Sequence, residues 1–402
     1  MDTRKIALDC LKQVRIDKKY ANLVLRETLQ QMDIKDRAWV TQVVYGTLRN
    51  YRHIRFQWET LAQTPVDDNT ALLLDMAIYQ LFMMKTPDYA VVNEMVELAV
   101  KSKKGLVNAI LRRVIDQGLM QSDKIEIRTS HPDWLYRLWV SHYGKEQADK
   151  ICEENTKEAI VHGRINTLKT SKSEVEQIDG VTFLDDYAFI ADFNIIQHPI
   201  FKEGMVVVQD ISSQQVVSYL DVQPNQVVLD CCAAPGTKTS QLGMMMKNQG
   251  RIVAGDIHPH RVKLLDEAMK KLGVEIVEGQ VWDATKISND LEKESFDRIL
   301  VDVPCSGFGV LKRKPEIKWN SSPQEIDELI HIQQDILTSV SQLLKPQGIM
   351  VYSTCTLNKK ENERQIEKFL KENEQFQCVE EKTIFPYDGH GDGFYIAKIV
   401  KK

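Results

Sequence analysis

The sequence lacks a paired-cysteine pattern. Seven cysteines are spread over 402 residues, and none belongs to a C-x-x-C pair. An odd number of scattered cysteines disfavours both a disulfide framework and a zinc ribbon. Free thiols suit a reducing compartment. We therefore expect a cytoplasmic protein that holds no metal.

Long apolar runs are also missing. The most apolar window, residues 71–84, is interrupted by Asp75 and Gln80 and is too short to span a bilayer. Residues 1–5 lead into an amphipathic helix pattern rather than a signal-peptide core. Hydrophobic residues make up 43% of the chain, enough for packed interiors. A soluble protein of two or three domains, without membrane attachment, is predicted.

Charge is distributed unevenly along the chain. Residues 1–125 hold 19 Lys and Arg against 15 Asp and Glu, a net of +4, whereas the remainder holds 33 against 42, a net of −9. A basic N-terminal part indicates a polyanionic partner. Arg49, Arg52 and Arg55, interleaved with Tyr51 and Trp58, fit RNA contact, although a solvated helix face explains them almost as well.

Three patterns follow one another along the chain. Residues 1–125 show helical spacing of apolar positions throughout, which predicts an all-α bundle. Residues 126–211 contain short strand signals at 161–167, 181–183 and 188–190, which predict a small α+β linking region that positions RNA. Residues 212–402 alternate between strand and helix, which predicts a Rossmann-like α/β domain with a parallel sheet. Its expected strands are 227–230, 251–256, 274–277, 298–302 and 348–353.

The first strand of this alternation leads into a loop of small residues. The loop matches neither G-x-G-x-x-G nor a P-loop, which disfavours a dinucleotide or a nucleoside triphosphate. Asp256, at the end of the second strand, is placed to hold ribose hydroxyls, or else it caps the following helix. Asp283, after the third strand, is a candidate for the adenine edge. These features favour S-adenosylmethionine, and the loop residues expected to bind it are Cys232, Ala233, Ala234, Pro235, Gly236, Thr237 and Lys238.

Two cysteines follow two later strands of the same domain. The sequence Asp302-Val303-Pro304-Cys305 leaves the fourth strand, and Cys355 ends the fifth. A lone cysteine is usually a small buried hydrophobe. Two of them at the ends of adjacent strands, beside a methyl-donor site, indicate one crevice that both thiols face.

These motifs together resemble those of a known enzyme family. Residues 232–238, 302–307 and 354–355 are similar to the signature motifs of RNA cytosine carbon-5 methyltransferases. The helical head resembles the NusB family, and segments 44–49, 108–112 and 130–132 are typical of the members that methylate 16S rRNA of the small ribosomal subunit. Where the family usually has a second glycine in the loop, this chain has Thr237. The resemblance implies S-adenosylmethionine as donor and ribosomal RNA as partner.

The resemblance also implies roles for the site residues. Cys355 is expected to be the nucleophile, and Cys305 to release the product. Asp302 is expected to hydrogen-bond the base near ring nitrogen 3 and also to help bind the donor. Lys238 favours a neighbouring thiolate, or else it only anchors the loop.

The segment after the Cys305 motif is rich in cations. Lys312, Arg313, Lys314 and Lys318, with Trp319, suit phosphate contact and base stacking, whereas the alternative is an ordinary basic surface loop. Two other functions stay open: the same chemistry on a tRNA cytosine, and a non-catalytic RNA-binding assembly factor. A monomer is expected.

Overall fold

The computed structural model describes residues 2–30, 32–389 and 391–402, and it divides into two compact units. The first unit is Met1–Glu158 with Leu311–Ser321, and the second is Ala159–Val310 with Ser322–Lys402. The three-domain division predicted from the sequence is a finer one and stays a prediction. In the described residues, no helix combines the length and the apolarity needed to cross a bilayer.

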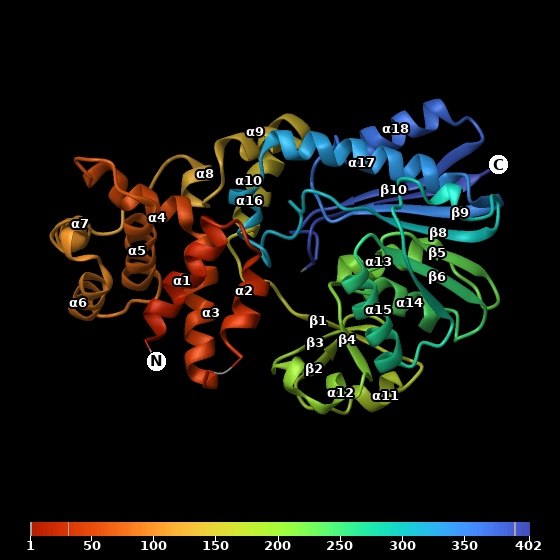
Figure 1. Cartoon of the computed structure of the whole chain (residues 1–402), viewed down its shortest axis with the longest axis horizontal. Coiled ribbons are helices and arrows are strands. Elements are labelled where there is room, and N and C mark those ends of the chain that lie inside the picture. The colour runs from red at the N-terminus through yellow and green to blue at the C-terminus, as the bar shows by residue number, and fades with distance from the viewer. Residues whose placement is uncertain (1, 31, 390) are drawn as a thin grey trace. The chain divides into compact units, whose positions relative to one another are not determined.

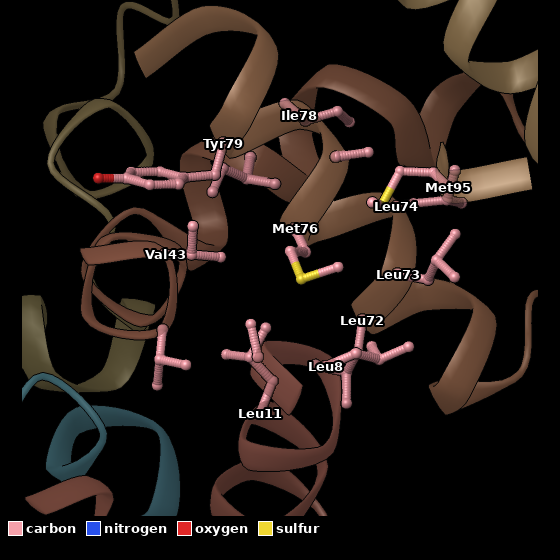
Figure 2. Close-up of a cluster of buried hydrophobic side chains, with 14 of the residues drawn as sticks. Leu8, Leu11, Val43, Leu72, Leu73, Leu74, Met76, Ile78, Tyr79 and Met95 are labelled. Carbon is pink, nitrogen blue, oxygen red and sulfur yellow. The ribbon is translucent and has the colours of Figure 1, made fainter. Parts of the chain in front are cut away.

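The first unit is helical, as predicted for its N-terminal part (Figure 1). Apolar residues at helical spacing gather into one core, where Leu8 and Leu11 meet Val43, Leu72 and Met76 (Figure 2). The helices are α1 (Thr3–Arg15), α2 (Ala21–Thr28), α3 (Ile34–Arg49), α4 (Tyr51–Trp58), α5 (Asp68–Ile78), α6 (Asp88–Leu98), α7 (Lys104–Gln117), α8 (Ile125–Arg128), α9 (Asp133–Tyr143), α10 (Lys145–Glu154) and α16 (Ile317–Asn320).

The second unit contains a small sheet and a large one. The small sheet is antiparallel, with the strand order β2-β3-β1-β4. Its strands are β1 (His162–Ile165), β2 (Val181–Phe183), β3 (Ala188–Ala191) and β4 (Val206–Val208), with α11 (Lys172–Val175) and α12 (Pro199–Lys202) between them. The strand signals in this region are confirmed.

The large sheet has seven strands in the order β10-β11-β9-β8-β5-β6-β7. The five strands from β9 to β7 are parallel, which confirms the predicted Rossmann-like sheet, and β11 and β10 join antiparallel. The strands are β5 (Val227–Asp230), β6 (Arg251–Asp256), β7 (Val277–Val281), β8 (Phe296–Asp302), β9 (Leu344–Thr354), β10 (Phe376–Ile384) and β11 (Phe394–Lys401).

Helices cover both faces of this sheet (Figure 1). Ile299 and Val301 point toward α17 and α18, whereas Leu300 between them points toward α13, α14 and α15. This alternation follows from the two-residue period of a strand. The helices are α13 (Ile211–Leu220), α14 (Thr237–Met245), α15 (Pro259–Leu272), α17 (Pro323–Ser341) and α18 (Glu363–Glu372).

The sequence misplaced or missed the two edge strands. The apolar run 274–277 predicted the third strand, but β7 occupies 277–281, and β10 had no prediction. Each edge strand has a neighbour on one side only and carries several exposed polar side chains. Edge strands therefore lack the apolar run that marks a buried strand.

One carboxylate is fully enclosed in the helical core of the first unit. Asp75 of α5 accepts hydrogen bonds from Arg55 and from the indole nitrogen of Trp58, at 3.0 and 2.9 Å. Asp75 itself is 0% exposed. These contacts give Arg55 a structural role and favour that interpretation over RNA contact for this residue.

Removing this carboxylate will destabilise the helical unit. Asp75→Ala removes the acceptor of the Trp58 indole N–H and leaves Arg55 with the exposed carboxylate of Glu59 as its only ion-pair partner among the described residues, at an expected cost of about 3 kcal/mol. Chemical denaturation followed by tryptophan fluorescence measures the loss. Asp116→Ala, at an exposed position of α7, is the control and should change stability by less than about 0.5 kcal/mol. Equal stability of the two variants would contradict the assignment.

Candidate active site

The carboxyl ends of four neighbouring strands bring the predicted residues together. In the sheet, β5 lies between β6 and β8, so the chain winds outward from β5 in one direction and then returns to its other side. Ligands bind at such a reversal in open α/β sheets. The donor loop follows β5, Asp256 ends β6, Asp302 ends β8, and Cys355 directly follows β9.

The loop after β5 turns sharply into α14. Gly236 has φ +101°, and a Cβ added there would lie 2.7 Å from Leu265 of α15, so only glycine fits this turn. Thr237 is the first residue of α14 and needs no such freedom. The departure from the family pattern at Thr237 is therefore compatible with the observed loop.

Asp230, the last residue of β5, lies beneath this loop and had no predicted role. One carboxylate oxygen accepts a hydrogen bond from the Thr239 hydroxyl at 2.8 Å, and the other is buried with no protein partner. Burial raises the pKa of Asp230 to about 7, and the negative charges of Asp302 and Asp256 add to the rise. The site therefore gathers three carboxyl groups around one loop.

Asp256 is buried at the end of β6 and holds two partners. Its carboxylate lies 2.8 Å from Arg261 and accepts a hydrogen bond from the His258 amide. Arg261 also donates to the carbonyl of Ala234 in the donor loop, at 2.7 Å. Arg261, which the sequence interpretation did not single out, thus links the predicted ribose carboxylate to the loop.

Asp283 lies beyond the end of β7. Its carboxylate accepts from the amide and the hydroxyl of Thr285, at 3.0 and 2.7 Å, which stabilises the turn there. The neighbouring Trp282 donates its indole N–H to the carbonyl of Cys231 at 3.0 Å. Trp282 therefore supports the donor loop, and the adenine role of Asp283 stays a prediction.

The two cysteines lie side by side. Strands β8 and β9 pair in parallel with Asp302 opposite Ser353, and the Sγ atoms of Cys305 and Cys355 are 3.3 Å apart. The predicted adjacency of the two strand ends is confirmed. Two thiols within one hydrogen-bond distance cannot both carry negative charge without strong repulsion.

An ion pair lies next to the thiols. Lys238 of α14 donates to Asp302 at 2.7 Å, and the hydroxyl of Ser353 donates to the other oxygen of Asp302 at 2.7 Å. Burial alone would lower the pKa of Lys238, but the charges of Asp302 and then of Cys355 raise it above its ordinary value. Lys238 is therefore a stable cation beside Asp302 and Cys355.

The two thiols have different charged neighbours. The hydrogen bond to Cys355, then burial and the negative charge of Cys355, raise the pKa of Cys305 well above its ordinary value. Glu361 contributes in the same direction. These causes raise the pKa of Cys305, and Cys355 is the thiol whose charge acts on Lys238.

Glu361, between Cys355 and α18, is a further site residue that the sequence did not indicate. It is 0% exposed, and its carboxylate accepts from the amide and hydroxyl of Ser306, from Gln333 and from Asn358. The Ser306 hydroxyl also bonds Thr356 at 2.7 Å. Because Ser306 follows Cys305 and Thr356 follows Cys355, this network joins the two cysteine loops.

The structure does not support phosphate contact by two of the four predicted cations. Lys312 and Lys318 are 3% and 1% exposed, within the helical unit. Lys318 donates to the carbonyl of Arg49, and burial lowers its pKa to about 7, so its charge is weakened as well as hidden. The segment packs inward because its aromatic residue, Trp319, donates to the carbonyl of Leu48. Arg313 is half-buried and Lys314 exposed, and their RNA role stays a prediction.

Comparison with known proteins gives three family models along the chain. Residues 217–400 match the 16S rRNA methyltransferase RsmB/F model, residues 1–116 match the NusB family, and residues 131–178 match the RsmF/B-like ferredoxin-like domain. These matches confirm the predicted order along the chain: a NusB-like head, a middle region and a methyltransferase domain.

Relatives match over the whole length. A probable ribosomal RNA small subunit methyltransferase B of Bacillus subtilis is 34% identical, over 99% of this chain and 98% of that protein. A protein of the same description from Synechocystis is 33% identical over 100% of both chains.

A solved structure has a similar fold over most of the chain. A methyltransferase homologue from Pyrococcus horikoshii is 28% identical with a TM-score of 0.62, over 70% of this chain and 100% of that one. The full-length relatives and the matching domain models together show that the chain belongs to the 16S rRNA methyltransferase RsmB/F family.

Proposed function

We propose that this rRNA methyltransferase transfers a methyl group from S-adenosylmethionine to carbon 5 of a cytosine in small-subunit rRNA, through a covalent bond between Cys355 and the base. The observation that carries the proposal is the pair of thiols 3.3 Å apart at the ends of two adjacent strands. A methyltransferase acting on a nitrogen or oxygen nucleophile needs no cysteine pair, whereas carbon 5 of cytosine needs covalent activation.

The residues around the donor loop fit S-adenosylmethionine. This donor carries a sulfonium and an ammonium group, and it supplies an electrophilic methyl group. Of the three carboxyl groups around the loop, Asp302 pairs with Lys238 and Asp256 with Arg261. One oxygen of Asp230 has no hydrogen-bond partner among the described residues and is left to accept from a ligand. Loop residues Cys232–Lys238 would hold it from one side and Asp256 its ribose from another, with Asp283 toward the adenine.

We assign the first step to Cys355 because it is the thiol whose charge acts on Lys238. Its sulfur, as the thiolate beside Lys238, adds to carbon 6 of the flipped-out cytosine and makes carbon 5 nucleophilic. Asp302 lies between Lys238 and Ser353, and we assign its carboxylate a hydrogen bond from the cytosine amino group next to ring nitrogen 3, where the Lys238 cation offsets the negative charge formed on addition. Carbon 5 then takes the methyl group.

We assign product release to Cys305. Once Cys355 is bound as a thioether, it no longer carries the negative charge that helps to keep Cys305 protonated. Cys305 can then lose its proton to solvent and remove the proton on carbon 5. The electron pair of that C–H bond re-forms the carbon 5–carbon 6 double bond, and Cys355 leaves carbon 6 as a thiolate.

Replacing each of the two cysteines by alanine will separate their roles. Cys355→Ala should abolish methylation, because no covalent bond to carbon 6 forms. Cys305→Ala should allow attack and methyl transfer but block release, so that a protein–RNA adduct accumulates on a denaturing gel. Cys378→Ala, at a half-buried cysteine of β10, should behave as wild type. An adduct with Cys355→Ala and none with Cys305→Ala would reverse the assignment.

The positive charge of Lys238 should set the pH dependence of attack. In the Cys305→Ala background, Lys238→Met removes the cation that favours the Cys355 thiolate. The pH at which adduct formation is half-maximal should then shift upward by about one unit, from roughly 1–2 kcal/mol of charge interaction. Lys238→Arg keeps the charge and should leave the midpoint within about 0.3 units. Equal midpoints for the Met and Arg variants would leave Lys238 only a loop anchor.

The position of the methyl group tests the proposal as a whole. Wild-type enzyme, radiolabelled S-adenosylmethionine and small-subunit rRNA should yield a label that bisulfite sequencing maps to a cytosine. A label on ring nitrogen or ribose oxygen would exclude the covalent mechanism. A label found on tRNA cytosine alone would move the same chemistry to the other substrate.

A further inference from the structure

A cavity of about 310 Å³ lies between α17 and α18, apart from the cysteine pair. Three cations line it from the segment that leads into α18 and from α18 itself: Lys360, Arg364 and Lys368. Arg364 and Lys368 are four residues apart, so they share one face of the helix. His331 and Gln334 of α17 line the opposite wall.

The cavity is lined by more cations than carboxylates. Asp327 lies 3.5 Å from Lys360 and offsets one cation. Among the residues that the structure describes, neither Arg364 nor Lys368 has a carboxylate within ion-pair distance. Two exposed cations therefore remain on a concave surface, which is the arrangement that attracts an anion.

Gln334 adds an independent sign of a ligand. Both its amide nitrogen and its amide oxygen are buried, and neither has a hydrogen-bond partner among the residues that the structure describes. Such unsatisfied buried groups are rare in folded proteins. A ligand that satisfies this side chain must both accept from the nitrogen and donate to the oxygen.

An RNA backbone offers a hydrogen-bond acceptor and a hydrogen-bond donor together. A phosphate oxygen accepts a hydrogen bond and carries the negative charge that Arg364 and Lys368 complement. The ribose 2′-hydroxyl donates as well as accepts, which a DNA backbone cannot reproduce. The chemistry of the cavity thus fits one nucleotide of RNA.

The cavity is linked to the catalytic loops. Lys360 comes five residues after Cys355 and precedes Glu361 directly. Gln333, next to Gln334, donates to Glu361 and to the carbonyl of Pro304. We propose that the α17–α18 cavity binds a backbone phosphate and the adjoining 2′-hydroxyl of the substrate RNA, beside the nucleotide that is methylated; this inference rests on the proposed function.

Salt-dependent binding tests the phosphate contact. The double variant Arg364→Ala/Lys368→Ala should bind a small-subunit rRNA fragment about tenfold more weakly at low salt. Its plot of log affinity against log salt should be shallower by about 1.4, the loss of two contacts to a single strand. Fluorescence anisotropy with a labelled fragment measures both values.

A matched control lies on the same helix. Lys371 is an exposed lysine of α18 that does not line the cavity, so Lys371→Ala should bind RNA with wild-type affinity and slope. Comparing Lys368→Ala with Lys371→Ala separates the cavity from a general loss of charge on α18. Equal effects of the two single variants would overturn the proposal.

Gln334→Leu tests the 2′-hydroxyl contact. This substitution fills the same space without the amide, so stability should be retained or improved. The affinity ratio between the RNA fragment and DNA of the same sequence should decrease about fivefold, the loss of one hydrogen bond. An unchanged ratio would exclude the 2′-hydroxyl contact.

Failure of this inference and failure of the proposed function give different results. Wild-type enzyme that forms 5-methylcytosine, with cavity variants that bind RNA as wild type does, overturns the cavity site alone. Wild-type enzyme that binds the rRNA fragment without forming 5-methylcytosine overturns the proposed function, while the salt slopes still decide the cavity. Wild-type enzyme that does not bind the fragment overturns both.

Discussion

The carboxylate of Glu361 holds the two cysteine loops together. It is fully buried and accepts four hydrogen bonds, two of them from Ser306. A buried carboxylate persists only when its acceptor positions are occupied, because an unsatisfied charge costs several kcal/mol. The loop after β8 and the loop after β9 are therefore fixed by one group. The 3.3 Å distance between the thiols depends on that constraint.

This constraint has an electrostatic consequence. Two thiols held so close titrate as a pair, and a charge on one opposes a charge on the other. Lys238 breaks the symmetry because its cation interacts with Cys355, whereas the negative charge of Glu361 acts on Cys305. The same carboxylate that positions the loops thus helps to decide which thiol keeps its proton. One hydrogen-bond network therefore positions the two thiols and also influences their protonation.

Much of this arrangement could be predicted from the sequence, because it depends on local patterns. A buried run followed by Asp302 and Cys305, and another followed by Cys355, places polar groups at strand ends, and βαβ alternation makes those strands parallel neighbours. Gly236 marks the turn of the donor loop in the same way. Each of these signals lies within a few residues of the feature it predicts.

The unpredicted features depend on contacts between distant segments. Glu361 lies in a polar stretch that resembles any solvated helix start, and its partners are as far away as Ser306 and Gln333. By composition, Lys312 and Lys318 look like surface cations. Distant partners explain their burial: the carboxylate of Glu154 for Lys312 and the carbonyl of Arg49 for Lys318. A sequence pattern indicates which residue types are present, but not which distant group satisfies them.

The buried lysines also bear on the role of the helical unit. That unit is built from two separate segments of the chain, and the second of them, Leu311–Ser321, begins six residues after Cys305. Arg49 donates to the carbonyl of Lys312, and Ala21 donates to Glu316. Asn320 donates to the carbonyl of Val14, so the segment is bonded along its length to the N-terminal helices. Burying lysines is unfavourable unless such partners are present. The N-terminal helices are therefore part of the fold of the segment that follows the Cys305 loop.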